Sequence, residues 1–190
     1  MMRIITGKAR GVKLDTLVGL ATRPTTEKVK EAILSMIQFD IEGRRVLDLF
    51  AGSGQMALEA LSRGAKDAVL VDASKEAAEI IRRNALKTKL FPDVKVIVSD
   101  YKAAIKQLSG IERFDIVFCD APYAAKLTGD ALESMYRADL LSDGAIVICE
   151  SDDDKTFENE GLVLHKQNRY GKTYISVYKK LENEEDNTIN

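Results

Sequence analysis

Short apolar runs alternate along the chain with segments whose apolar positions recur at helical spacing. The runs predict five buried strands and the segments between them predict four helices. The strands are expected at 45–50, 68–71, 94–98, 114–119 and 145–149, and the helices at 55–63, 75–88, 101–108 and 128–138. Strands and helices in alternation are typical of an α/β protein with a doubly wound, mostly parallel sheet.

Both ends of the chain depart from this alternation. Two β-rich runs, at 162–165 and 173–178, flank Arg-Tyr-Gly-Lys and predict a C-terminal antiparallel hairpin at the edge of the sheet. Ahead of the sheet, the segments 3–6 and 12–14 flank two glycines and predict a small basic hairpin.

A helix is expected between this hairpin and the first strand. Five apolar residues share one face of it, and Thr25 or Thr26 is the expected N-cap. The five are Val29, Ala32, Ile33, Met36 and Ile37.

The composition indicates one core. With 190 residues and 45% hydrophobic content, we expect a single domain over 1–181, with 1–25 as its basic N-terminal extension and 182–190 as a disordered acidic tail. No signal peptide or membrane span is expected. The two cysteines lack the spacing and the histidine cluster of a metal site, so we expect a cytoplasmic protein without a bound metal.

Positive charge is concentrated near the N-terminus. The formal charge of the whole chain is −2, yet residues 1–30 hold seven basic residues against two acidic ones. This stretch is therefore a candidate surface for phosphate groups. The basic residues are Arg3, Lys8, Arg10, Lys13, Arg23, Lys28 and Lys30.

A glycine turn follows the first predicted strand, in the sequence Asp-Leu-Phe-Ala-Gly-Ser-Gly from Asp48 to Gly54. Gly52 and Gly54 lack the Cβ atoms that keep a ligand away from the backbone, so the turn can hold a nucleotide-like cofactor. With Ala57 and Asp72 the turn also satisfies the dinucleotide pattern, so the turn alone leaves NAD and S-adenosylmethionine open.

Two further acids shift this balance. Asp48 can face the positively charged amino group of the methionine portion of S-adenosylmethionine, whereas it would repel a pyrophosphate. Asp100 closes the third strand, where it can accept a hydrogen bond from the adenine amine. An aspartate after a strand is also a common helix cap, and that simpler interpretation stays open.

A second motif, Asp120-Ala121-Pro122-Tyr123, follows the fourth strand. It combines a hydrogen-bond acceptor, a stiff backbone and a stacking ring, which suits the exocyclic amine of a nucleobase. In a doubly wound sheet the strand order reverses between the first and fourth strands, and ligands bind at the carboxyl ends there. The motif and the glycine turn are therefore expected side by side.

Taken with Arg23-Pro24-Thr25, Arg3-Ile4-Ile5-x-Gly7 and Arg169-Tyr170-Gly171-Lys172, these motifs resemble the RsmD family over residues 3–179. That family consists of bacterial Rossmann-like class I methyltransferases, which use S-adenosylmethionine to modify the 2-amino group of a guanine in small-subunit ribosomal RNA. The resemblance implies three sets of site residues. Asp120, Ala121, Pro122 and Tyr123 would be catalytic; Asp48, Phe50, Ala51, Gly52, Ser53, Gly54, Asp72, Ala73, Asp100 and Tyr101 would bind the cofactor; and Arg3, Lys8, Arg10, Lys13, Arg23, Arg169 and Lys172 would bind RNA.

The chain departs from the family at Ala121, where the usual residue is proline. Alanine supplies the same backbone carbonyl, and a residue before proline is still restricted to extended conformations. Three alternatives stay open: an adenine-amine methyltransferase acting on DNA, a non-catalytic RNA-binding relative, and an NAD-dependent Rossmann protein. The sequence also leaves open whether ribosomal RNA is met free or in an assembling subunit.

Overall fold

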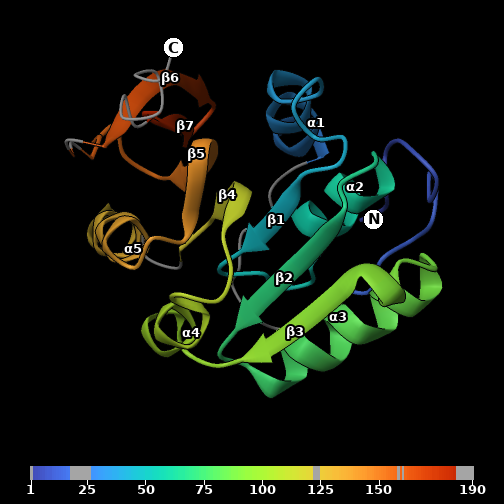
Figure 1. Cartoon of the computed structure of the whole chain (residues 1–190). Coiled ribbons are helices and arrows are strands. Elements are labelled where there is room, and N and C mark those ends of the chain that lie inside the picture. Colours follow the sequence, from blue (N-terminus) through green and yellow to red (C-terminus); the bar gives the residue numbers. More distant parts are fainter. Residues whose placement is uncertain (1, 18–26, 122–124, 158, 160, 183–190) are drawn as a thin grey trace, which may run out of the picture.

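The computed structural model of the chain describes residues 2–17, 27–121, 125–157, 159 and 161–182. Seven strands in these residues form one sheet, in the order β3-β2-β1-β4-β5-β7-β6 (Figure 1). The strands are β1 (Arg45–Asp48), β2 (Asp67–Asp72), β3 (Val94–Val98), β4 (Phe114–Cys119), β5 (Leu141–Ser151), β6 (Leu162–Tyr170) and β7 (Thr173–Lys180). The helices are α1 (Glu27–Met36), α2 (Gln55–Ser62), α3 (Lys75–Lys87), α4 (Tyr101–Leu108) and α5 (Ala125–Arg137), with a short 3-10 helix, η1 (Phe91–Asp93).

The topology is the predicted doubly wound sheet with an antiparallel hairpin at one edge. Strands β1 to β5 pair in parallel, whereas β7 pairs antiparallel with β5 and with β6. The strand order reverses at β1, which lies between β2 and β4. Asp48, the last residue of β1, is in register with Phe118 of β4, so both strands end at the same edge of the sheet. This edge is where the ligand crevice is expected.

Each face of the sheet has its own apolar core. Side chains alternate between the faces along a strand, so Val46 packs with α1, α2 and α3 while Leu47 packs with α4 and α5. Figure 1 shows these two groups of helices on opposite sides of the sheet. Both faces of the inner strands β1, β2 and β4 are covered, which explains why these strands appear in the sequence as continuous apolar runs.

Some boundaries differ from the predicted ones. β5 begins at Leu141 instead of residue 145, with an irregularity in its pairing with β4, and β6 continues to Tyr170 instead of residue 165. Both missed stretches are mostly polar, and pairing of the backbone holds them in the sheet. In α1, Lys30 and Leu34 are buried, whereas two residues of the predicted face, Ala32 and Met36, are only half-buried.

The predicted N-terminal hairpin forms as a short antiparallel pairing. Arg3 and Lys13 make a β-bridge, and the Ile4 N–H donates to the Val12 carbonyl at 2.9 Å. Gly7, with a φ of +80°, lets the turn lie directly on α2: a Cβ atom there would be 1.8 Å from the Ser62 carbonyl oxygen.

Some predictions concern residues that the structure does not describe. The expected caps Thr25 and Thr26, and residues 183–190 of the expected tail, lie outside the described residues. In the part of the chain that is described, no helix has the length and apolar character needed to cross a membrane.

Candidate active site

The glycine turn connects β1 to α2 at the carboxyl edge of the sheet. Its backbone is fixed by hydrogen bonds from Ala51 N–H to the Val71 carbonyl at 2.9 Å and from Gly54 N–H to the Ala51 carbonyl at 2.7 Å. A Cβ atom on Gly52 would meet no other heavy atom within 4 Å, so the space beside this residue is open to a ligand.

Gly54 has a different role from the expected one. A Cβ atom there would lie 2.9 Å from Cδ2 of Leu70 and 3.3 Å from Cγ1 of Ile81, so the missing side chain leaves room for the core and not for a ligand. Its φ of 78° at the N-cap of α2 is a second reason for glycine.

Asp72, at the end of β2, holds the glycine turn in place. Its Oδ2 accepts a hydrogen bond from the Gly52 N–H and its Oδ1 one from the Ser74 N–H, both at 2.8 Å. The carboxylate therefore lies against the turn, and Ala73 beside it is exposed. Asp72 thus lies beside the predicted cofactor loop, and the contact with a cofactor ribose that its spacing indicated stays a prediction.

Asp48 is buried directly beneath this loop, with 3% of its surface exposed. Burial, and then the nearby carboxylates of Asp120 and Asp72, raise its pKa to about 7, against hydrogen bonds from the backbone N–H groups of Ala57 and Phe50 that lower it. A buried carboxyl with a raised pKa favours a cationic partner, because a positive charge restores the stability of its ionised form.

Asp100 is the N-cap of α4. Its Oδ1 accepts hydrogen bonds from the backbone N–H groups of Lys102 at 3.0 Å and Ala103 at 3.1 Å, so Asp100 caps the helix, and its hydrogen bond to the adenine amine stays a prediction. Its neighbour Tyr101 lies against Phe50 of the glycine loop, with the ring centroids 5.4 Å apart. The two rings form an aromatic wall beside the loop.

Asp120 and Glu150 are the acids at the ends of β4 and β5. The preceding residues, Cys119 and Cys149, are paired in register, so the two acids are neighbours across the strands. The side chain of Asp120 is solvent-exposed, yet partial desolvation of its carboxylate, and then the negative charge of Glu150, raise its pKa to about 7.

A small pocket opens beside these acids. It is lined by apolar side chains of α1, α2, β4 and β5, by Cys119 and by the two acids; the apolar residues are Ile33, Met56, Phe118 and Ile148. Ala121 is buried, and Pro122 and Tyr123 lie outside the described residues. Glu150 was not among the predicted site residues, although it follows an apolar run of the sequence as Asp120 does.

The predicted N-terminal basic residues are spread along the hairpin, and Arg3, Lys8, Arg10 and Lys13 are all exposed. The open end of the hairpin lies near the glycine loop, where Sδ of Met2 accepts a hydrogen bond from the Ser53 hydroxyl at 3.2 Å. Its closed turn lies at the other end of α2, and Lys8 pairs there with Asp93 at 3.7 Å. Arg3 and Lys13 are therefore nearer to the site than Lys8 and Arg10.

Lys30 was counted among the N-terminal basic residues of the candidate phosphate surface, but it does not belong to this surface. It is fully buried, its Nζ lies 3.4 Å from Glu59, and it donates to the Arg3 carbonyl at 2.6 Å. Burial lowers the pKa of Lys30 and the charge of Glu59 opposes that change. Glu59 also accepts the N–H groups of Ile5 and Thr6, each at 2.8 Å, so this pair attaches the hairpin to α1 and α2.

Asn84 of α3 is a second anchor that the sequence analysis missed. It is fully buried, accepts the Asp15 N–H at 2.8 Å, and donates to the carbonyls of Asp15 at 3.0 Å and Ser53 at 2.9 Å. One amide thus joins the N-terminal segment to the glycine loop. The available signal was a polar residue on the apolar face of a predicted helix.

Arg169 and Lys172 lie at the tip of the β6–β7 hairpin and are exposed. β7 is antiparallel to β5, with Tyr174 beside Ser151, so this tip lies at the same edge of the sheet as Asp120. The Arg169 guanidinium stacks 5.5 Å from the ring centre of Tyr174. The remaining predicted RNA residue, Arg23, is outside the described residues.

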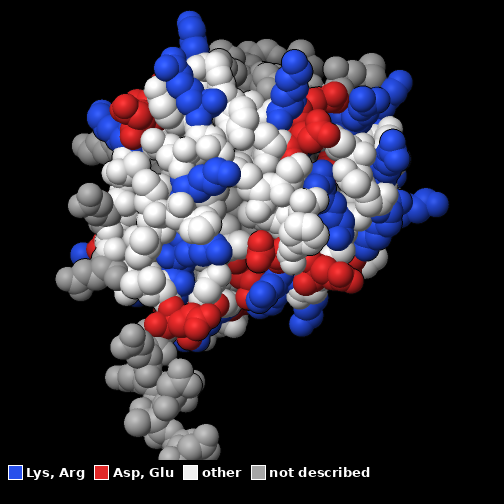
Figure 2. All heavy atoms as spheres, turned by 90° about the horizontal axis from the view of Figure 1, so that it is seen from above, with Lys and Arg blue, Asp and Glu red and all other residues white. Residues whose placement is uncertain are grey.

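Seen from above, Lys and Arg side chains crowd the right-hand rim of the molecule (Figure 2), the side on which Figure 1 shows α3 and the N-terminal segment. Acidic side chains lie between them, so the surface is mixed.

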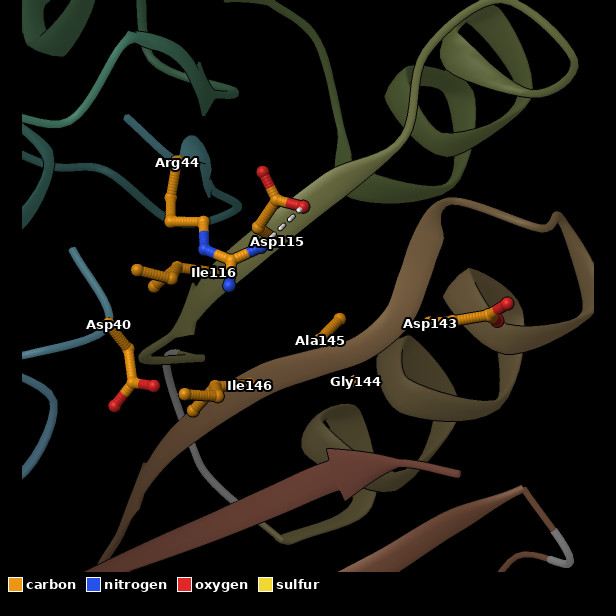
Figure 3. A pocket seen from close by; sticks show the side chains of 8 residues that line it. All are labelled: Asp40, Arg44, Asp115, Ile116, Asp143, Gly144, Ala145 and Ile146. Atoms are coloured by element: carbon orange, nitrogen blue, oxygen red, sulfur yellow. Dashed lines mark ion pairs between the residues drawn. The ribbon is translucent and has the colours of Figure 1, made fainter. Parts of the chain in front are cut away.

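A second pocket lies at the opposite, amino edge of the sheet (Figure 3). Arg44 points toward Asp115, with Nη1 3.8 Å from Oδ1, whereas Asp143 points away. Its acids are therefore not gathered around one point, and no group of three or more possible metal ligands occurs among the described residues.

The doubly wound sheet, with an open glycine loop and acids at the carboxyl ends of neighbouring strands, is the fold of a Rossmann-like methyltransferase. The chain belongs to the family described as Conserved hypothetical protein 95, whose model matches residues 2–179. Among curated relatives, YlbH of Bacillus subtilis is 35% identical over 182 residues, which cover 94% of this chain and 99% of that protein. The Ribosomal RNA small subunit methyltransferase D of Haemophilus influenzae is 33% identical over 169 residues, covering 87% and 88%. These matches confirm the resemblance to the RsmD family.

Solved structures agree with this placement. The Escherichia coli protein yhhF superimposes with a TM-score of 0.86 at 29% identity, covering 96% of this chain and 99% of that one. An RNA methyltransferase from Salinibacter ruber, solved in complex with S-adenosyl-L-homocysteine, shares the fold with a TM-score of 0.66 at 15% identity, covering 88% and 99%.

Proposed function

We propose that the chain transfers the methyl group of S-adenosylmethionine to the exocyclic 2-amino group of a guanine in small-subunit ribosomal RNA. The observation that carries the proposal is the placement of Asp48 and Asp120 on adjacent parallel strands, at one edge of the sheet. The first strand runs into an open glycine turn and the second into an Asp-Ala-Pro-Tyr segment. A methyl donor and an amine acceptor would therefore meet within one domain.

The residues present fit S-adenosylmethionine better than NAD. The space beside Gly52 admits a ligand to the backbone, and buried Asp48 offers a carboxylate to the cofactor's positively charged amino group. A pyrophosphate would place negative charge beside Asp48 and Asp72, which costs free energy. Asp72 would accept from the ribose, and the wall of Phe50 and Tyr101 would contact the adenine. The family match and the S-adenosyl-L-homocysteine complex of the Salinibacter ruber protein support the same cofactor.

The acceptor side calls for a carboxylate because the amine of a nucleobase is a weak nucleophile. Its lone pair is delocalised into the ring, and hydrogen bonds from both N–H groups to acceptors turn that lone pair toward the methyl group. Asp120 would accept one N–H, and the carbonyl of Ala121 the other. The bound cofactor supplies a methyl group on a positively charged sulfur. The new N–C bond uses the amine lone pair, the electrons of the broken C–S bond stay on sulfur, and the amine proton leaves to solvent afterwards.

The RNA would meet the carboxyl edge of the sheet. Arg169 and Lys172 of the β6–β7 tip, and Arg3 and Lys13 at the open end of the N-terminal hairpin, are exposed basic residues near that edge. The name of the Haemophilus influenzae relative supports ribosomal RNA as the partner. The target base must leave its helix or lie in an unpaired loop, where the ring of Tyr123 would stack on it.

A paired substitution at Asp120 tests the proposal. Asp120→Ala should lower methyl transfer to small-subunit ribosomal RNA at least about a hundredfold, since it removes a charge-stabilising hydrogen bond from a preorganised site. Asp120→Asn is the matched control, because its carbonyl still accepts one N–H and should retain more activity. The affinity for S-adenosyl-L-homocysteine, measured by calorimetry, should barely change in either variant. Near-normal turnover of Asp120→Ala would show that the segment is structural.

A further inference from the structure

Glu150 faces the same pocket as Asp120. Side chains alternate along a strand, so Cys119 and Cys149 point to the α4–α5 face, whereas Asp120 and Glu150 point with Phe118 and Ile148 toward α1 and α2. Both acids line one pocket with apolar side chains. The repulsion between the two charges contributes to the raised pKa of Asp120, in keeping with their closeness. Two neighbouring carboxylates at one edge of the sheet can accept hydrogen bonds from a planar group with two adjacent donors.

Guanine presents two adjacent donors on its Watson–Crick edge, the N1–H and the 2-amino group. Adenine presents its amine beside an N1 atom that carries a lone pair. A single carboxylate can accept a hydrogen bond from either amine, so Asp120 alone does not distinguish the two bases. A second carboxylate at N1 does, because it accepts a hydrogen bond from the guanine N1–H and repels the lone pair of an unprotonated N1.

We infer that Glu150 accepts the N1–H of the target guanine while Asp120 accepts from its 2-amino group, so that Glu150 selects guanine over purines whose N1 is unprotonated. This inference rests on the proposed function, and it assigns the choice of base to a residue outside the Asp-Ala-Pro-Tyr segment. A site built to accept a hydrogen bond from a substrate N–H strongly rejects an analogue without that N–H, because the acceptor is then left unpaired.

The probe is 2-aminopurine, which has the same 2-amino group but an N1 with a lone pair and no hydrogen. Two small-subunit RNAs are assembled by ligation, with guanine or 2-aminopurine at the position that methyl mapping identifies. The wild type should prefer guanine in kcat/KM by at least about a hundredfold. Glu150→Gln should reduce this preference at least about tenfold, because an amide can donate a hydrogen bond to the lone pair of N1.

Three further variants make the test specific. Glu150→Asp keeps the carboxylate and should keep most of the preference for guanine, whereas Glu150→Ala removes the repulsion and should reduce it. Asp152→Asn removes the same charge from an exposed position two residues further on and should leave the preference unchanged. Circular dichroism and affinity for S-adenosyl-L-homocysteine establish that each variant is folded.

The outcomes separate this inference from the proposed function. If the wild type methylates neither RNA, the proposed function fails. If it methylates guanine and every Glu150 variant keeps the wild-type preference, the proposed function stands and the role of Glu150 is wrong.

Discussion

Replacing Asp48 with asparagine should make the protein without its cofactor more stable at alkaline pH. Asp48 is 3% exposed, and burial, together with the charges of Asp120 and Asp72, raises its pKa from 3.8 to about 7. A carboxyl whose pKa is higher in the folded than in the unfolded state stabilises the fold only while it is protonated. This contribution is complete below about pH 4 and is lost as the pH rises through 7.

The size of the effect follows from the shift. A shift of about three pKa units corresponds to about 4 kcal/mol between the two protonation states, all of it unfavourable to the fold by about pH 8. Asparagine cannot ionise, but its single carbonyl oxygen replaces two oxygens that accept from Ala57 and Phe50, and a lost hydrogen bond costs about 1 kcal/mol. Asp48→Asn should therefore be about 2–3 kcal/mol more stable than the wild type at pH 8, and no more stable than it at pH 4.

Urea unfolding followed by far-ultraviolet circular dichroism measures this difference between pH 4 and pH 8. The chain has no tryptophan, so fluorescence is less suitable. Asp40→Asn is the control, because Asp40 is an exposed acid of a loop and its substitution should give no such trend. If the free energies of unfolding of the wild type and Asp48→Asn changed in parallel across this pH range, Asp48 would not be a buried acid with a raised pKa.

Three other results are expected. Binding of S-adenosylmethionine near pH 7 should release protons, because the amino group of the cofactor favours ionised Asp48. Calorimetry in buffers of different ionisation enthalpy should detect this release, and Asp48→Asn should lose it. NAD should give no heat of binding. Replacing both Arg3 and Lys13 with serine should lower the slope of log RNA affinity against log salt by about 1.4, at about 0.7 per phosphate contact. Replacing both Lys8 and Arg10 should lower this slope less. Equal slopes for the two double variants in filter binding would contradict the placement of the RNA. Ala121→Pro should keep or modestly raise methyl transfer, and a large loss would refute the account of that segment.

The sequence predicts the parts of the fold that have a periodic pattern. β4 is buried on both faces and appears as an apolar run with the observed bounds, and the edge strand β3, although only partly buried, also has the predicted bounds. The extensions of β5 and β6 could not be predicted from hydrophobicity, because most of their residues are polar and join the sheet through backbone pairing and polar side-chain contacts, such as that of Gln167 with Ser176.

The residues of the site, likewise, could be predicted only where a sequence pattern marks them. Asp48, Asp72 and Asp120 were found because each follows a strand, and parallel topology brings strand ends together. Lys30, Glu59 and Asn84 were missed because each binds a partner at least 27 positions away. A polar residue on an apolar helix face indicates a buried contact, but the sequence does not identify the partner.

The central claim is methyl transfer to the 2-amino group of a ribosomal guanine. It is tested most directly with small ribosomal subunits and naked small-subunit RNA from a strain that lacks this protein, incubated with the purified protein and isotopically labelled S-adenosylmethionine. Mass spectrometry of the nucleosides should find the label in N2-methylguanosine, at one position that is unmodified in the deletion strain. Label in N6-methyladenosine, or none in either RNA substrate, would contradict the account.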